Sequence, residues 1–185
     1  MGDFDMSKDH RIAGAILFPM ALVGLSCNLS VLAFLRSMPS LNNSFGSLTL
    51  SQAIIDSIHQ FLFAFYFSPT IFFQNPALYN LSDHFGYLTL MAYQICCYSH
   101  LCISVNRFAA VCVPLMYKRL FSVKKTQIII VGYWILGIVH MTIMLKLVDC
   151  SIYLPTNTWI FTFKVTTGCY YVMWYGDFLL NSISV

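Results

Sequence analysis

The sequence predicts an all-α membrane protein with several spanning helices. Hydrophobic residues make up 58% of the 185 residues and charged residues only 9%. The apolar residues also gather in long runs that short polar segments separate. A soluble domain carries about 25% charged residues, so this chain has too few charges to cover a surface that faces water. We therefore expect the lipid bilayer as a partner and no nucleic acid.

The first predicted span covers residues 12–35, a run without a charged residue. At about 1.5 Å per residue a helix of this length reaches about 36 Å, which crosses a hydrocarbon core of about 30 Å with some tilt. Asn28 lies inside this run. Its side chain either faces the interior of the helix bundle or bonds its own backbone.

The second predicted span covers residues 45–68, and we expect Pro69 to end it. It carries Asp56 near its middle. An ionised Asp near mid-bilayer costs about 2.5–3.5 kcal/mol on insertion scales, which favours a position inside the bundle over one that faces lipid. The alternative is a structural Asp that bonds the backbone or a serine.

The remaining predicted spans cover residues 85–111, 127–148 and 169–185. The third is the most polar, which makes it a candidate for the centre of the bundle. The fifth apolar segment ends with the chain, so we expect about five spans. The loop after the third span carries four basic residues, at 118, 119, 124 and 125, whereas the amino terminus and the loop after the second span hold most of the acids. Basic loops face the cytoplasm, which places the amino terminus outside.

The third span ends in Asn106-Arg107-Phe108, and Pro114 and Tyr117 follow in a Pro-Leu-x-Tyr sequence. This pattern resembles the cytoplasmic end of the third helix in rhodopsin-like G-protein-coupled receptors, which carry Asp-Arg-Tyr and then Pro-Leu-x-Tyr at the same distance. The resemblance implies a seven-helix architecture, of which about five helices are present here. It also implies that these five residues form the switch that contacts a heterotrimeric G protein. The alternative is an arginine that only orients the membrane edge.

Segments 43–54, 98–108 and 169–178 together resemble nematode serpentine chemoreceptors of the serpentine receptor class x family. The resemblance implies a plasma-membrane receptor for external chemicals, with a small-molecule or peptide ligand and no cofactor. Asn28 and Asp56 are 28 positions apart, as are the interior Asn and Asp of rhodopsin-like receptors, which share water and a sodium ion. One departure is Asn106, which cannot carry the charge of the usual Asp.

Two further sites are expected toward the outside. Tyr93 and Gln94 lie three to four turns outward from Arg107, where they line a ligand pocket with parts of loop 149–168 or simply pack between helices. Cys150 and Cys169 bound that loop and face the oxidising side, so we expect a disulfide between them, with two free thiols as the alternative.

Other function classes receive little support from the sequence. A membrane-embedded enzyme needs paired carboxylates, a nucleophile with a base or a metal cluster, and Asp56 is a lone acid on its helix. Cys96-Cys97 lacks a metal-binding spacing, so we assign no metal. The other reading of the chain is a truncated, non-signalling receptor fragment or a partner of full-length receptors.

Overall fold

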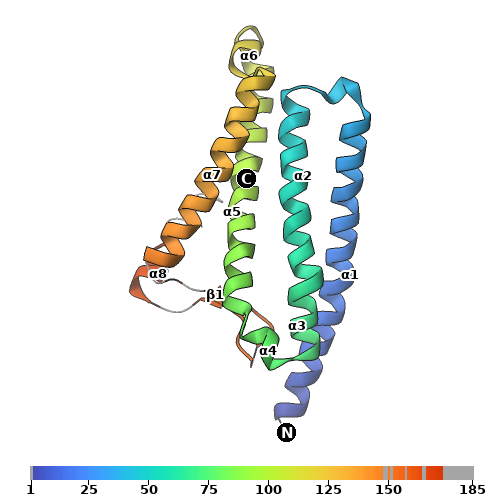
Figure 1. Ribbon diagram of the computed structural model, residues 1–185, viewed down its shortest axis with the longest axis vertical. Helices are drawn as coiled ribbons and strands as arrows, with labels where there is room; N and C mark the ends of the chain where they lie inside the picture. The colour runs from blue at the N-terminus through green and yellow to red at the C-terminus, as the bar shows by residue number, and fades with distance from the viewer. Residues whose placement is uncertain (1, 148–149, 151, 157, 164–165, 173–185) are drawn as a thin grey trace.

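The computed structural model describes residues 2–147, 150, 152–156, 158–163 and 166–172 (Figure 1). Four long rods dominate this part of the chain, and α2 packs against both α1 and α5 while α7 packs on α5 and α2. The rods comprise α1 (Gly2–Ser37), α2 (Ser44–Leu62) with its extension α3 (Ser68–Phe73), α5 (Ser82–Cys112) and α7 (Val123–Leu147). The short elements are a 3-10 turn (Pro39–Leu41), α4 (Pro76–Tyr79), α6 (Pro114–Leu120), α8 (Thr167–Val172), β1 (Ile152–Tyr153) and β2 (Thr162–Phe163).

The rods run between two ends of the molecule. One end carries the amino terminus, α4 and the β-strands, and the other carries α6 and the connection between α1 and α2 (Figure 1). We call the end with α6 the inner end and the other the outer end. Among the described helices, those over Lys8–Ser37, Ser82–Cys112 and Val123–Leu145 are long and apolar enough to cross a membrane. Helix α2 carries the polar side chains of Gln52, Asp56, His59 and Gln60.

The sequence predicted that Pro69 ends the second span, but in the structure the second rod continues past Pro69. A π-helical turn (Phe63–Phe67) follows α2, and α3 then continues the rod to Phe73. Proline removes one backbone donor, and its ring clashes with the carbonyl four residues earlier in a regular α-helix. The wider π turn just before Pro69, in which the Ser68 amide donates to the Phe63 carbonyl, accommodates this clash. The rod finally ends at Gln74, whose φ of 52° is left-handed.

Other boundaries differ from the expected spans in smaller ways. Helix α1 begins well before residue 12, and the loop that follows the third span folds into α6. Of the fifth expected span, residues 169–185, only the first residues belong to α8, and residues 173–185 lie outside the described part of the chain.

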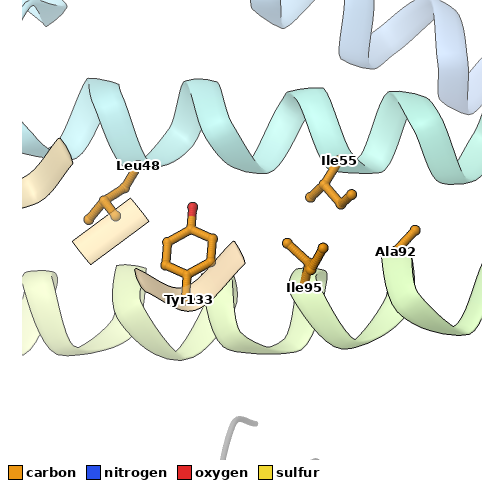
Figure 2. Close-up of a cluster of buried hydrophobic side chains, with 5 residues drawn as sticks. All are labelled: Leu48, Ile55, Ala92, Ile95 and Tyr133. Atoms are coloured by element: carbon orange, nitrogen blue, oxygen red, sulfur yellow. The ribbon is translucent and has the colours of Figure 1, made fainter. Parts of the chain in front are cut away.

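A buried apolar cluster joins three of the rods. Figure 2 shows Leu48 and Ile55 of α2 facing Ala92 and Ile95 of α5, with the ring of Tyr133 from α7 between them. All five side chains are at most 4% exposed. By contrast, many large apolar side chains of α1 and α7 lie on the surface, which suits a protein whose outer faces contact lipid.

Candidate functional site

At the inner end, Asn106 and Tyr117 face each other. Asn106 is only 1% exposed. Its Nδ2 lies 3.3 Å from the Tyr117 hydroxyl, which in turn lies 3.4 Å from Asn106 Oδ1. Pro114 starts α6, where its missing N–H costs nothing, and α6 folds back so that Tyr117 reaches α5. The Pro-Leu-x-Tyr sequence thus braces the end of α5.

Arg107 instead lies on the surface. Its guanidinium carbon sits 5.3 Å from the centre of the Phe45 ring in the first turn of α2, a cation–π contact. The chain has no acidic residue between Asp9 and Asp56, or between Asp83 and Asp149, so the described residues of the inner end offer this arginine no carboxylate. Large apolar side chains are exposed beside it, among them Phe108 (66%) and Leu115 (98%).

The connection after α6 is tied to the start of α2. The Ser44 hydroxyl donates to the Phe121 carbonyl at 2.6 Å, and Asn43 caps α2 by accepting from the Gly46 amide at 2.9 Å. The ends of α2, α5 and α6 therefore form one ordered surface around Arg107.

Midway along the bundle, Asp56 is held by a polar network. Gln52 Nε2 donates to both carboxylate oxygens of Asp56, at 2.9 and 2.8 Å, and Cys96 Sγ donates to Oδ1 at 3.0 Å. The same Gln52 nitrogen lies 3.1 Å from His100 Nε2, while Gln52 Oε1 is buried without a partner among the described residues. Residues 52 and 56, like 96 and 100, are four apart and share a helix face. That spacing was visible in the sequence, but it did not reveal that the two faces meet.

Asn28 lies at the level of Asp56 on the neighbouring helix. A Cβ on Gly24 would come within 3.0 Å of Gln60 Cδ, so α1 and α2 approach closely at this point. Because α1 and α2 are antiparallel, Asn28, four residues after Gly24, reaches the same height as Asp56, four residues before Gln60. Within the described residues no hydrogen bond joins the two, and Asn28 is half-buried.

A second buried hydrogen-bond cluster ties α2 to α7. The Ser51 hydroxyl accepts from the Tyr133 hydroxyl at 2.6 Å and from Trp134 Nε1 at 2.9 Å. Ser99 of α5 donates to Tyr133 at 3.4 Å. Further toward the outer end, the Tyr98 hydroxyl meets His140 Nδ1 at 2.8 Å, so α7 is fixed to both of its neighbours.

Gln94 is a buried polar side chain near the outer half of α5. It is 1% exposed, and its amide nitrogen and oxygen form no well-aligned hydrogen bond in the described part of the chain, although the Tyr98 hydroxyl one turn inward interacts with it. Tyr93, the next residue on the helix, is half-buried and about 100° away around the axis. The two side chains therefore face different neighbours.

The outer end is covered by a small hairpin that the sequence did not predict. Strands β1 and β2 pair antiparallel, and a disulfide joins Cys150 to Cys169. A Cβ on Gly86 would lie 2.7 Å from Ile152 Cγ2, so only glycine lets β1 cross α5 here. On the other side Phe161 packs edge-on against Phe67, with ring centres 4.4 Å apart. Gln94 lies two turns inward from this crossing, about 12 Å along the helix.

Comparisons with known proteins agree with this architecture. The family described as "Serpentine type 7TM GPCR chemoreceptor Srx" matches residues 18–185. Serpentine receptor class X 45 of Caenorhabditis elegans is 34% identical over 132 residues, which are 70% of this chain and 37% of that protein. Serpentine receptor class X-43 of the same organism is 24% identical over 166 residues, 90% of this chain and 52% of that protein.

Among solved structures, squid rhodopsin shares the fold. The TM-score is 0.80 at 12% sequence identity, over 96% of this chain and 51% of the rhodopsin chain. This chain therefore spans about half the length of the proteins it resembles, or less.

Proposed function

Since the chain belongs to the Srx family of serpentine chemoreceptors, we propose that it detects an external chemical between its helices and signals to a heterotrimeric G protein at the inner end. It is a multi-pass membrane protein with a rhodopsin-like helical fold. We place the protein in the plasma membrane, with its amino terminus outside the cell. The basic residues of the inner end support that orientation, because basic loops stay in the cytoplasm.

The observation that carries the G-protein contact is the placement of Arg107. Its neighbour Asn106 is buried and hydrogen-bonded to Tyr117, while Arg107 is exposed and, among the described residues, contacts the face of Phe45. An exposed cation–π contact contributes about 0.5–1 kcal/mol, so the guanidinium is easily transferred to another partner. The exposed apolar side chains beside it provide a surface for a protein partner.

The proposed ligand pocket lies between Gln94 and the outer hairpin. A buried amide without a well-aligned hydrogen bond costs about 1–3 kcal/mol, and a ligand that bonds Gln94 would remove this penalty. The outer end of the bundle is rich in aromatic rings, including the stacked pair Tyr66 and Phe85, with centres 3.7 Å apart. A small, largely apolar molecule with one or two hydrogen-bonding groups suits such a site, with Tyr93 contributing from the adjacent face.

Asp56 is proposed as the interior polar centre that couples the two regions. Its carboxylate is held by side chains from α2 and α5, and Asn28 lies at the same height on α1. A sodium ion is the proposed occupant, since carboxylate and amide oxygens are hard ligands and Gln52 Oε1 has no partner among the described residues.

The function is tested with the longest natural form of this receptor in cells that report G-protein activation. We expect Arg107→Ala to abolish most ligand-dependent signalling at unchanged surface expression. Arg36→Ala removes a basic residue at the same end, outside the proposed contact, and should signal within about twofold of wild type. Full signalling by Arg107→Ala would refute the proposed contact.

A further inference from the structure

A groove runs between α2 and α7 on the surface of the bundle, starting near the inner end. It has a volume of about 540 Å³. Helix α2 contributes side chains at helical spacing from Ser47 to Ile54, and α7 contributes a stripe from Gln127 to Ile138. The walls are mostly apolar, and Val131 and Ile135 are more than half exposed.

The dimensions of the groove match one lipid tail. Ile138 lies 11 positions after Gln127, which is about 16 Å of helix, or about half of a hydrocarbon core of about 30 Å. Trp134 lies among the lining residues, and its indole N–H is already bonded to Ser51. The indole thus offers the groove an apolar surface and no available donor.

The inner mouth of the groove is positively charged. Lys124 lies three residues before Gln127, on the same face of α7, and is exposed. The neighbouring Lys125 instead donates to the Arg119 carbonyl at 2.5 Å. The described residues of the inner end include six basic side chains (Arg36, Arg107, Lys118, Arg119, Lys124 and Lys125) and no acidic one, so this part of the chain supplies no counter-charge there.

We propose that this groove binds one acyl chain of an anionic phospholipid, whose headgroup phosphate contacts Lys124. The hydrophobic tail lies in the groove against its apolar walls, and the polar side chains of Ser47 and Gln127 lie at the level of the ester groups. The ammonium group of Lys124 neutralises the headgroup. The amino-terminal end of α7 adds a partial positive charge at the same level. This binding does not require signalling or a ligand at the outer end.

Trp134 is a built-in reporter for the test. The chain has three tryptophans, and Trp159→Phe with Trp174→Phe leaves Trp134 alone. This chain is placed in phosphatidylcholine nanodiscs, and two series are compared. One contains increasing fractions of phosphatidylglycerol brominated in the acyl chain, and the other contains increasing fractions of phosphatidylcholine brominated in the same way. Bromine quenches indole fluorescence at contact. We expect half-maximal quenching at an about fivefold lower fraction of the anionic lipid, equivalent to about 1 kcal/mol for one lysine.

Charge and shape are tested separately. Lys124→Gln should remove the preference for the anionic lipid, whereas Lys118→Gln, an equal change on α6, should keep it. Unbrominated phosphatidylglycerol should restore the fluorescence, and cholesterol should not. The proposal is overturned by equal quenching with both headgroups, by equal effects of the two substitutions, or by cholesterol displacing the brominated lipid. Each of these results leaves the G-protein test unaffected.

Discussion

At the scale of single residues, the neighbours Asn106 and Arg107 have different roles: Asn106 holds α6 against α5, and Arg107 presents a positive charge on the surface. The sequence shows only that Asn106 cannot carry the charge of the usual Asp. In the structure Asn106 turns into the bundle toward Tyr117, and Arg107 turns outward onto Phe45. The inner end thus has a neutral brace and a separate, exposed cation.

A carboxylate at position 106 should change this balance. Charge-assisted hydrogen bonds are roughly twice as strong as neutral ones, so Asn106→Asp should attract Arg107 and strengthen the bond from Tyr117. We expect the basal signalling of the longest natural form to fall about five- to tenfold, as for a gain of about 1–1.4 kcal/mol.

The measurement is ligand-free reporter activity at matched surface expression. Tyr117→Phe, which removes the brace without adding a charge, serves as the comparison and should raise basal activity. Unchanged or higher activity in Asn106→Asp would contradict the expected attraction.

The sequence predicted some of these residues better than others. Asp56 was placed in the interior because its charge makes a lipid-facing position costly, and this argument needs no partner. The network that Asp56 forms with Gln52 and Cys96, and that Gln52 extends to His100, was not predicted, because that requires the rotation and height of α2 relative to α5. Cys96 is the clearest example, since a thiol in an apolar run looks like a small hydrophobe.

At the scale of elements, the bonds to Ser51 fix α7 against α2. One hydroxyl accepts from two side chains, Tyr133 and Trp134. The sequence indicated the long helices from their apolar runs, because such a signal is local. It did not indicate α6 or the β-hairpin, which are short and depend on contacts with distant residues such as Phe67 and Gly86.

Ser51→Ala should therefore destabilise the bundle more than an ordinary surface change. The substitution leaves two donors without their acceptor, which costs about 1–3 kcal/mol. Ser47→Ala is the matched control, since that hydroxyl bonds only the Asn43 carbonyl of its own turn and is less buried. Thermal unfolding in nanodiscs, followed by near-ultraviolet circular dichroism, measures both. Equal midpoints for the two variants would show that the Ser51 bonds contribute nothing.

At the scale of the whole molecule, the two ends are built differently. The inner end is basic and stabilised by side-chain to backbone bonds, while the outer end is closed by a hairpin with a disulfide across its base. Cys150 and Cys169 are 19 residues apart. Closing a loop of this length stabilises a fold by about 3 kcal/mol, mainly through the unfolded chain.

Peptide mapping should find the two cysteines linked. In protein prepared without reductant, Cys150 and Cys169 should resist alkylation until the disulfide is reduced. Cys112, an exposed thiol at the inner end, should react at once and serves as the internal control. Reduction should also lower the unfolding midpoint of the wild type but not that of the Cys150→Ser/Cys169→Ser double variant. Alkylation of both cysteines before reduction would rule out the bond.

The π-helical turn before Pro69 has a consequence for how sequences of this family are aligned. A regular helix rotates by about 100° per residue, whereas a π turn absorbs one additional residue with little change in direction. The residues of α3, including the fully buried Thr70 and Ile71, therefore face the bundle as they would in a chain one residue shorter. A relative with an uninterrupted α-helix would match this protein with a one-residue gap at 63–67, and ungapped numbering would assign every outer position of the second rod to the wrong face.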